Sequence, residues 1–575
     1  MKQVHLNGES LDIEQVIAVA VNGASVTIDT SKLAASRNYI VKKVAEEKII
    51  YGVTTGFGSN TDKSIAAEDT EQLQINLLRS HACGVGKNFS REVTRAAMVI
   101  RLNTLLKGYS GVQESTVAQL QFFLNNYIHP AVPEQGSVGA SGDLCPLAHM
   151  ALPLMGEGEI EYQGQLFNTE EFLQTEQARA IGFKTVRLSY KEGLALTNGT
   201  TFICAAGAIA LWKAQRLLDT AIRCAALIFE AIGARTSAYA YDKIHLARRH
   251  RGQIKVAQQL TKLLEDSTYV GVAQRDLIQA LLEKKRELLD RCGITGVLQQ
   301  LVVEKDEQRQ LQLPETVIFK AAAAEEHALA QLLRFARKKW KPQDAYSIRC
   351  VPQVLGASEA AIQHVEDILN NELNAAGDNP LIFPEDDAVV SGGNFHGQPV
   401  ALIMDYLKLA VAEIGNLTER QINKLVDGST NDALPSFLIE GSGLNNGLMI
   451  SQYAAAAIVS ENKVLVHPAS ADSIPTCENT EDHVSMGTIA ARQAIEVADN
   501  VERVLAIALM TSYYAFALRR KQLLVFGITR QQSMAGEALC RQIAAANPAL
   551  IKEDFFATDR FLSREIKAIA EAFFP

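Results

Sequence analysis

The stretch GQPVALIMDYLKLAVAEIGNLTERQINKL, which runs from Gly397 to Leu425, decides the fold class of this sequence. Its apolar residues recur with helical periodicity, and no proline interrupts it after Pro399, so it predicts one long amphipathic helix. Similar apolar-rich stretches are Arg91 to Leu106, Asn198 to Glu230, Leu444 to Val466 and His483 to Arg519. Helices of this length bury their apolar faces against one another, which favours a bundle.

The alternation of apolar and polar residues that is typical of strands is confined to short pieces, such as Ser25–Ile28 and Glu159–Tyr162. The sequence therefore predicts a mainly α protein, with a long central helical bundle and a smaller N-terminal mixed region. We expect an N-terminal region, a central bundle and C-terminal helices, at residues 1–190, 191–520 and 521–575.

A charged segment interrupts the central bundle at about residues 265–342. Clusters of basic residues, at Lys284–Glu287 and Lys338–Lys341, flank Leu- and Ala-rich helical stretches with Pro314 between them. We interpret the segment as a helical insertion on the surface, because long insertions cost a fold little. Since it directly precedes Gln343–Arg349, the alternative is that it covers a binding site there.

The composition is that of a soluble, folded protein that acts on small molecules. The 575 residues are 47% hydrophobic and 21% charged, and the formal net charge is −9. No basic run with interleaved aromatic residues is present, so nucleic acid is not an expected partner. The eight cysteines show no C-x-x-C spacing, which argues against a zinc ribbon or a disulfide framework and predicts reduced, mostly buried thiols.

The N-terminal residues lack the apolar core of a secretory signal. The most hydrophobic stretch without charge, Gly193 to Trp212, is long enough to cross a bilayer but contains the polar run Thr197–Thr201. We therefore expect a buried core helix preceded by a turn, no membrane association, and a cytoplasmic protein.

Glycine and proline are densest in two loops, Pro130–Gly142 and Gly377–Gly397. The first contains Ala140, Ser141 and Gly142. Because glycine has no Cβ, the nitrogen of residue 142 can approach the carbonyl of residue 140. Loss of water there and from the serine would leave an alkene conjugated to an imidazolone, which is an electrophile. The alternative is a flexible loop that precedes a helix.

A second glycine-rich stretch, Tyr51–Gly58, suits a mobile loop that carries one aromatic hydroxyl, although an isolated tyrosine is more often buried with its hydroxyl satisfied. Other polar or aromatic candidates lie at predicted helix ends and turns: His81, Asn198, Gln343, Tyr346, Arg349, Phe395 and Glu481. Taken singly, each is most often structural. Since buried glutamate and arginine are rare in apolar bundles, Glu481 and Arg349 are the most informative.

Together these segments resemble the aromatic amino acid ammonia-lyase and aminomutase family, and most closely its histidine ammonia-lyase branch. The resemblance covers most of the chain and implies the all-α fold that this family shares with the fumarases. The motifs that carry it are Tyr51–Gly58 (YGVTTGFG), Ser80–Gly86 (SHACGVG), Gly139–Leu144 (GASGDL), Asn198–Thr200 (NGT), Gln343–Arg349 (QDAYSIR), Gly392–His396 (GGNFH) and Glu481–Met486 (EDHVSM).

The resemblance implies that Ala140, Ser141 and Gly142 cyclise to 4-methylideneimidazol-5-one (MIO), with no metal or external cofactor. It also implies a homotetramer whose active sites draw residues from three subunits. Elimination of an α-amino group needs an electrophile for the amine and a base for a weakly acidic β-proton. By resemblance MIO is the electrophile and Tyr51 is the base. Because a free tyrosine has a pKa of about 10, cationic neighbours or helix N-termini would have to favour its phenolate.

The remaining roles also come from the resemblance. Arg349 would bind the substrate carboxylate, for which a planar two-pronged donor is suited. Asn198 would hydrogen-bond near the MIO carbonyl, with Tyr346 and Gln343 beside it, and Phe395 would pack against MIO.

The substrate side chain would meet His81 and Glu481. The family's histidine enzymes carry Glu-Asp-His where its phenylalanine and tyrosine enzymes usually carry glutamine, and a carboxylate can accept a hydrogen bond from an imidazole N–H. We therefore expect ammonia elimination from L-histidine to give urocanate, as in histidine catabolism.

Two alternatives stay open. Departures from the family pattern at Thr54, Thr201 and Gly377, and in the run from Thr476 to Thr480, would suit a tyrosine or phenylalanine ammonia-lyase or a 2,3-aminomutase. The second alternative is a catalytically inactive helical tetramer that serves only as a binding or scaffold protein. The complete set of site residues argues against it.

Overall fold

The computed structural model describes residues 2–303, 311–552 and 554–574. The chain forms two compact units, which we call unit 1 (Met1–Lys213, Ile362–Lys408 and Val466–Glu496) and unit 2 (Ala214–Ala361, Leu409–Leu465 and Val497–Pro575). Four long helices contribute residues to both units: α10 (Thr201–Ile232), α20 (Val351–Glu372), α21 (Gln398–Val426) and α23 (Gly487–Leu524). The units therefore gather separate segments of the chain, and the consecutive three-part division stays a prediction.

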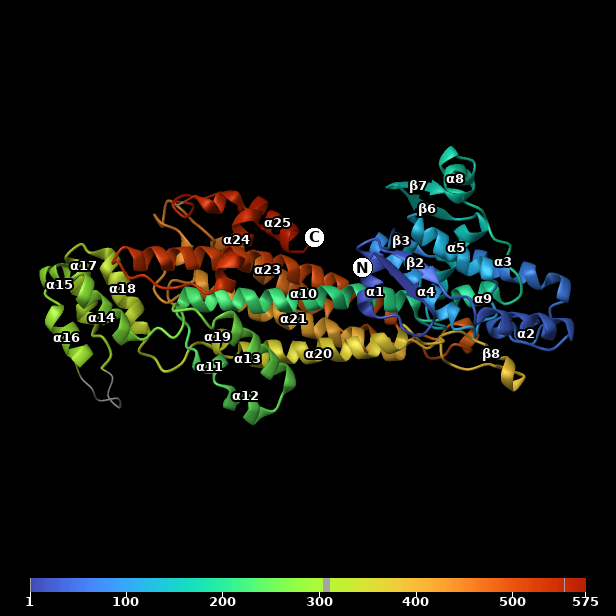
Figure 1. Cartoon of the computed structure of the whole chain (residues 1–575), viewed down its shortest axis with the longest axis horizontal. Helices are drawn as coiled ribbons and strands as arrows, with labels where there is room; N and C mark the ends of the chain where they lie inside the picture. Colours follow the sequence, from blue (N-terminus) through green and yellow to red (C-terminus); the bar gives the residue numbers. More distant parts are fainter. Residues whose placement is uncertain (1, 304–310, 553, 575) are drawn as a thin grey trace. The chain divides into compact units, whose positions relative to one another are not determined.

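Unit 1 is mixed. Its own helices are α1 (Ile13–Ala20), α2 (Leu33–Ala45), α3 (Thr70–His81), α4 (Arg91–Leu106), α5 (Glu114–Asn125), α6 (Leu144–Ala151), α7 (Thr169–Leu173), α8 (Glu176–Ile181) and α9 (Glu192–Thr197). Its strands are β1 (Gln3–Leu6), β2 (Ser25–Ile28), β3 (Val85–Asn88), β4 (Ile128–Pro130), β5 (Pro133–Gln135), β6 (Glu159–Tyr162), β7 (Gln165–Asn168), β8 (Leu381–Phe383) and β9 (Ala388–Val390). Figure 1 shows the β6–β7 hairpin beside α7 and α8.

The strands form small separate sheets. β1 and β2 are parallel, with Gln3 opposite Ser25, whereas β4, β6 and β7 form an antiparallel sheet in which Ile128 lies opposite Tyr162. The other two pairs, β3 with β5 and β8 with β9, are antiparallel. The two strands predicted from alternation, β2 and β6, are both present.

Helix α4 has the predicted bounds, and the predicted apolar face is buried. The Ser90 hydroxyl caps it by accepting a hydrogen bond of 3.3 Å from the Val93 N–H. Every residue from Val93 to Leu106 is buried, including Arg95 and Arg101, so α4 is enclosed on all sides. Such enclosure requires each buried guanidinium to find acceptors, and Arg95 donates to the carbonyls of Val19 and Leu124.

Unit 2 consists of helices throughout the part that the structure describes. Besides its shares of the four long helices, it contains α11 (Ser237–Ala240), α12 (Asp242–Arg248), α13 (Arg251–Leu263), α14 (Gln274–Lys284), α15 (Arg286–Arg291), α16 (Thr295–Val303), α17 (Glu315–Ala323), α18 (His327–Lys338), α19 (Tyr346–Arg349), α22 (Met449–Leu465), α24 (Met534–Ala546) and α25 (Leu562–Phe573). Short 3-10 helices complete the chain at Gly58–Asn60, Ala67–Asp69, Leu152–Met155, Pro384–Asp386, Ser436–Leu438, Ala469–Ala471, Cys477–Asn479 and Pro548–Ile551.

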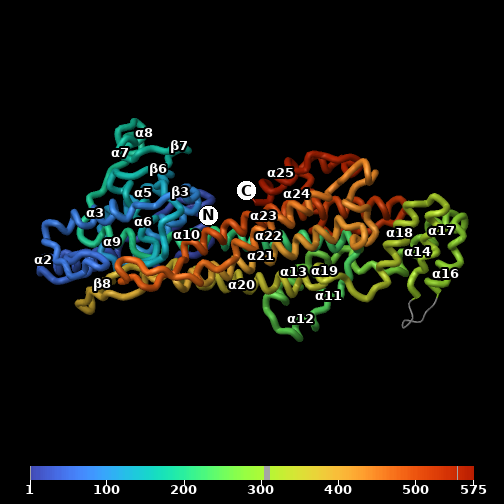
Figure 2. The backbone as a smooth tube through the Cα atoms, turned by 180° about the vertical axis from the view of Figure 1, so that it is seen from behind, coloured from blue at the N-terminus to red at the C-terminus, as the bar shows by residue number. Residues whose placement is uncertain are grey.

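The long helices of unit 2 form the predicted bundle, in which α10, α21 and α23 lie side by side in both views (Figures 1 and 2). Buried hydrogen bonds link neighbouring helices: Ser358 in α20 donates to the Ala410 carbonyl in α21 over 2.8 Å. Asn500 in α23 likewise donates to Asn462 in α22 over 2.9 Å. These bonds satisfy polar groups inside an apolar core, where unpaired ones would be costly.

The predicted insertion is helical where it is described, and α14 to α18 lie together in unit 2 (Figure 1). Leu281, Leu333 and Phe335 are among the buried residues of this group. Part of the predicted insertion, residues 304–310, lies outside the described residues.

Two apolar segments bear on the predicted absence of a membrane span. The stretch Gly193–Trp212 is divided between α9 and α10 by a turn at Asn198–Thr200, and all of its residues except the half-buried Trp212 are buried, as predicted. Among the described residues, α23 alone is long and apolar enough to cross a membrane, and 78% of its most apolar window is buried inside the protein. Such burial is typical of a core helix.

All eight cysteines are free thiols. Four are buried, three are half-buried, and Cys83 is exposed.

Candidate active site

The loop that contains Ala140, Ser141 and Gly142 is held by the carboxylate of Asp143, which is fully buried. This carboxylate accepts hydrogen bonds from the Thr488 hydroxyl (2.6 Å) and the Ile203 N–H (2.8 Å). Burial raises the pKa of Asp143 to about 6, and these hydrogen bonds oppose the shift. Asp143 thus joins the loop to the first turns of α10 and α23.

Gly142 must be glycine in this conformation. Its φ is +76°, and a Cβ there would lie 2.2 Å from the carbonyl oxygen of Gly199. The two backbones pair directly, because the Gly199 N–H donates to the Ser141 carbonyl (3.0 Å) and the Gly199 carbonyl accepts from the Asp143 N–H (2.8 Å). The loop is therefore clamped on both sides of residue 142.

A segment distant in sequence, residues 481–488, runs along the same loop. The Met486 N–H donates to the Val138 carbonyl over 2.9 Å, and the Ser485 hydroxyl donates to the Gly139 carbonyl over 3.3 Å. The structure thus brings together two of the motifs that the sequence singled out, although 340 positions separate Ser141 from Glu481.

Glu481 is the charge on which the candidate residues of unit 1 converge. Its carboxylate accepts hydrogen bonds from the hydroxyls of Ser141 (3.1 Å) and Thr476 (2.8 Å). It also acts electrostatically on Tyr51 and on His81. Tyr51, His81, Ser141 and Glu481 therefore belong to one site.

Tyr51 is half-buried at the start of its glycine-rich loop, and its hydroxyl oxygen accepts a hydrogen bond of 3.2 Å from the Gly58 N–H. Burial raises the pKa of the Tyr51 phenol; the Gly58 N–H lowers it, and the charge of Glu481 raises it. A phenolate here must therefore gain its stabilisation from a source other than Glu481. Among the described residues, the groups found to act on Tyr51 include no cation.

Thr54, which departs from the family pattern, has a local structural role. Its hydroxyl accepts from the Ile50 N–H (2.9 Å) and donates to the Lys48 carbonyl (2.7 Å). These bonds fix the turn that precedes Tyr51.

His81 ends α3, and its Nδ1 lies 3.0 Å from the Ser80 hydroxyl. Burial lowers the pKa of His81, and the Leu77 carbonyl and the charge of Glu481 oppose that shift. The ring is therefore neutral at pH 7 and available as a hydrogen-bonding group.

Asn198 follows α9 and is buried. Its side-chain amide donates to the Asn379 carbonyl over 2.9 Å and to Asp378 over 3.4 Å. Asp378 in turn makes a buried ion pair of 2.6 Å with Lys191. Burial lowers the pKa of Lys191, and the Asp378 charge opposes it.

The Arg101 guanidinium donates a hydrogen bond to the Asn198 carbonyl. Arg101 is completely buried, which lowers its pKa to about 10.

Phe395 is half-buried in the segment before α21. It is next to His396, whose ring stacks on that of His483 with 5.7 Å between the ring centres. Ala140 is half-buried beside Ser141.

The other predicted residues, Gln343, Tyr346 and Arg349, belong to unit 2, so the structure groups the predicted site residues in two sets. Tyr346 is 72% exposed, and the Arg349 guanidinium lies 4.6 Å from the centre of its ring. The Arg349 Nε is buried without a hydrogen-bond partner among the described residues. This set presents a planar cation next to an exposed aromatic ring.

The sequence did not single out Asp143, Lys191, Asp378 or Arg101. Asp143 lies inside the quoted motif Gly139–Leu144 and Asp378 inside the loop Gly377–Gly397, yet only the fold shows that their side chains are buried. A buried charge needs a partner, and in the case of Lys191 that partner is 187 positions away. Over the described part of the chain, no cluster of three or more His, Cys, Asp or Glu residues could hold a metal ion.

Comparisons with known proteins identify the family of the chain. The sequence profile of a family described as aromatic amino acid lyase matches residues 11–544. A histidine ammonia-lyase from Caldanaerobacter subterraneus subsp. tengcongensis is 43% identical over 523 residues, which covers 90% of this chain and 89% of the relative. Another from Symbiobacterium thermophilum is 41% identical over 574 residues, which covers 99% of this chain and 96% of the relative.

Solved structures are similar as well. The histidine ammonia-lyase from Trypanosoma cruzi matches with a TM-score of 0.79 and 34% identity, covering 99% of this chain and 93% of that one. The tyrosine aminomutase from Streptomyces globisporus matches with a TM-score of 0.81 and 34% identity, covering 99% and 96%. The chain therefore belongs to the aromatic amino acid lyase family, which confirms the resemblance and the mainly α fold predicted from the sequence.

The Lys191–Asp378 pair gives a test of how the site is supported. In Asp378→Asn the Lys191 ammonium loses its buried counter-charge, so we expect the free energy of unfolding to fall by about 3–5 kcal/mol. Denaturant unfolding of the variant and of the wild type measures this difference. The matched control is Asp386→Asn, which changes an exposed aspartate of the same unit and should stay within about 0.5 kcal/mol of wild type. Equal stability of the two variants would contradict the role of the pair.

Proposed function

We propose that this carbon–nitrogen lyase eliminates ammonia from L-histidine to give urocanate. The observation that carries the proposal is the 3.1 Å hydrogen bond between Ser141 Oγ and Glu481 Oε1, since it brings a carboxylate to the loop expected to react. The similarity to histidine ammonia-lyases over 90% or more of the chain supports this choice of substrate.

The residues at 140–142 fit the formation of MIO. Cyclisation joins the nitrogen of residue 142 to the carbonyl carbon of residue 140, which requires a sharp bend and no side chain at residue 142. The positive φ of Gly142 and its close contact with Gly199 supply both conditions. MIO in this place supplies an electrophile for the amino group of the substrate. The buried network around Asp143 excludes water from one side of the loop and keeps it bent.

In the reaction the Cα–N bond breaks and the β-proton moves to Tyr51 Oη, while the electron pair of the Cβ–H bond becomes the new double bond. Tyr51 must be ionised to accept this proton. Because burial and Glu481 both raise its pKa, the phenolate would need stabilisation by a cation or a helix N-terminus beyond the groups that act on Tyr51 here.

The substrate carboxylate is assigned to Arg349, whose guanidinium can bind it through two parallel hydrogen bonds. Tyr346 and Gln343 flank it on the same segment, and Asn198 hydrogen-bonds near the reacting loop. His81 and Glu481 face the imidazole of the substrate: the carboxylate accepts from a ring N–H and the neutral His81 ring offers a second hydrogen-bonding group. Phe395 supplies an apolar contact to the loop.

The enzyme is assigned as a cytoplasmic homotetramer with shared active sites, whose only other partner is the amino acid substrate, without nucleic acid or membrane. Two features support self-association. The predicted carboxylate-binding segment is exposed at Tyr346. Helix α22 also presents apolar side chains to solvent, with Ile450, Tyr453 and Val464 exposed by 60%, 59% and 74%.

The first test is incubation of the purified protein with L-histidine, L-tyrosine and L-phenylalanine in separate reactions. Urocanate from histidine alone is expected, followed by its ultraviolet absorbance. In Ser141→Ala the electrophile cannot form. We therefore expect the near-ultraviolet absorbance of MIO to disappear and kcat to fall at least about a thousandfold. The control is Ser391→Ala, an exposed serine. Coumarate, cinnamate or a β-amino acid as the main product would contradict the proposal.

The electrostatic coupling of Tyr51 and Glu481 predicts a pH effect. Because the charge of Glu481 raises the pKa of Tyr51, the limb of kcat/KM that rises with pH should move to lower pH in Glu481→Gln. The exposed neighbour gives the control, Asp482→Asn, whose limb should stay in place. The position of the limb is read independently of the absolute rate. A limb that moves to higher pH, or moves equally in both variants, argues against Tyr51 as the base.

Shared active sites predict complementation between inactive variants. Ser141→Ala and Arg349→Ala, each inactive alone, should regain a measurable part of the wild-type activity when the two chains are co-expressed and assemble together. The control pair is Ser141→Ala with Glu481→Ala, because these residues meet within one chain and no mixed site would contain both intact. Restored activity in the control pair, or none in the first pair, would rule out this arrangement.

A further inference from the structure

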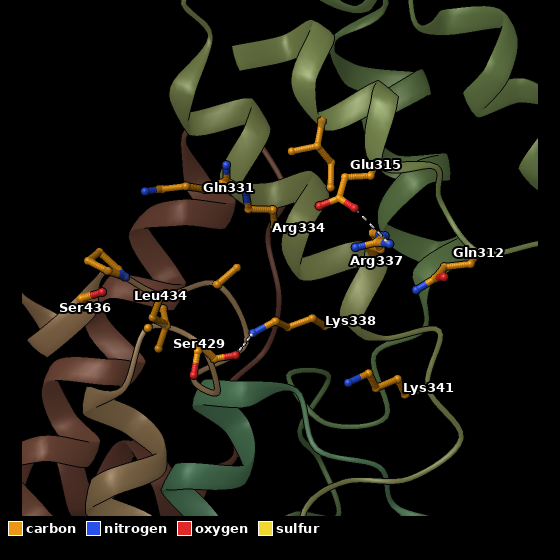
Figure 3. A pocket seen from close by; sticks show the side chains of 14 residues that line it. Gln312, Glu315, Gln331, Arg334, Arg337, Lys338, Lys341, Ser429, Leu434 and Ser436 are labelled. Atoms are coloured by element: carbon orange, nitrogen blue, oxygen red, sulfur yellow. Dashed lines mark hydrogen bonds and ion pairs between the residues drawn. The ribbon is translucent and has the colours of Figure 1, made fainter. Parts of the chain in front are cut away.

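A pocket of about 550 Å³ lies within unit 2, between helices α17 and α18 of the insertion and the segment 428–436 that follows α21 (Figure 3). This volume is within the range of small-molecule sites, about 300–1,000 Å³. None of the residues assigned to the active site lines it. The pocket is therefore separate from the residues assigned to the amino acid substrate.

The lining is strongly basic. Four cationic side chains, those of Arg334, Arg337, Lys338 and Lys341, come from one stretch of chain, and Glu315 is the single carboxylate among the lining residues. Figure 3 shows these side chains around the opening, with the Ser429 and Ser436 hydroxyls on the facing segment. A concave surface of one charge focuses its field and attracts ions of the opposite sign.

Two of the four cations are engaged within the protein. Arg337 pairs with Glu315 at 3.6 Å and donates from Nε to the Leu313 carbonyl at 3.1 Å. Lys338 donates from Nζ to the Ser429 carbonyl over 2.8 Å. By contrast, the Arg334 and Lys341 side chains have no ion pair or hydrogen bond to another described residue. About two positive charges are thus left for a ligand.

The residues next to the pocket lining also carry more positive than negative charge. The Nζ atoms of Lys339 and Lys424 both form ion pairs with a single buried carboxylate, that of Asp432, at 3.5 and 3.2 Å. Burial lowers the pKa of Lys338, and Lys424 and Lys341 lower it further, although Asp432 opposes them. Cations held this close repel one another, and a bound anion would relieve the repulsion.

We propose that this pocket binds a phosphate-bearing small molecule. The donors present suit a tetrahedral dianion: a guanidinium that can bind two oxygens at once, a flexible ammonium, serine hydroxyls, and the side-chain amides of Gln312 and Gln331. Ile318 and Leu434 provide apolar contact for the part of the ligand that carries the phosphate.

The pocket is joined to the segment that contains Gln343. Lys341 is two positions earlier in the chain, and the Arg235 guanidinium donates to the carbonyls of Lys339 (2.7 Å) and Lys341. The Arg235 N–H also donates to the Asp344 carboxylate over 2.8 Å. A ligand bound to Lys341 would therefore be connected, through Arg235 and Asp344, to the segment that we assign to the substrate carboxylate.

Calorimetric titration of the full-length protein at low ionic strength tests the proposal, with orthophosphate, pyrophosphate, ADP and citrate as separate probes. Binding of pyrophosphate or ADP is expected, with a Kd of about 1 mM or tighter. Arg334→Ala/Lys341→Ala should weaken it at least tenfold. Both residues are exposed, so the double variant should fold, and an unchanged thermal midpoint verifies this. Arg286→Ala/Lys320→Ala removes the same charge from exposed sites of the insertion outside the pocket and should bind as the wild type does.

The pattern across the probes identifies the ligand. Binding of orthophosphate as tightly as ADP would assign the site to free phosphate, and preference for ADP would assign it to a phosphate ester or anhydride. No binding of any phosphate probe, binding of citrate alone, or equal binding by the Arg334→Ala/Lys341→Ala variant would overturn the proposal. Because the readout is heat of binding, the result is independent of whether the protein turns over histidine.

Discussion

The candidate active site of unit 1 depends on one buried carboxylate, that of Asp143. It accepts hydrogen bonds from the first turns of α10 and α23, at Ile203 and Thr488, and so fixes the direction from which both helices enter the site. A charge in this position is expensive, as its raised pKa shows, and it is tolerated because several donors converge on it. The adjacent backbone pairing of Ser141 with Gly199, which shortly precedes α10, adds a second constraint, so the shape of the loop depends on segments distant in sequence.

The electrostatics of unit 1 set a condition on the proposed base. Glu481 is well placed to accept a proton-bearing group of a substrate, but its charge works against ionisation of Tyr51. Tyr51 would need a nearby cation or helix N-terminus to act as a base, whereas Arg349, the residue proposed for the substrate carboxylate, belongs to unit 2 beside an exposed aromatic ring. In the proposed roles, the groups that handle protons and the loop of Ala140, Ser141 and Gly142 are in unit 1, and the group that binds the substrate carboxylate is in unit 2.

Periodicity in the sequence was sufficient for the fold class and for most long helices, because burial of an apolar face is a local pattern. Arg91–Leu106 was predicted to the residue, whereas the helix expected from Asn198 begins at Thr201, since the preceding turn pairs with a distant loop. Local patterns do not encode such pairings, and they could not reveal that Lys191 and Asp378 neutralise each other inside the protein. The residues of the candidate site came from motifs rather than from periodicity. Their grouping in two units could not be predicted, because it is a property of tertiary structure.

The contact between the loop around Ser141 and residues 481–488 has a consequence during translation of the chain. The two parts are separated by 340 positions. At a synthesis rate of about 5–20 residues per second, residues 481–488 are therefore made roughly 20–70 s after the loop. During that time the loop can pair with Gly199 and Ile203, but it lacks the hydrogen bonds that involve Glu481, Ser485 and Thr488. The contacts of this loop are therefore complete only after residue 488 has been made, and a chain released before that point would contain Ala140, Ser141 and Gly142 without them.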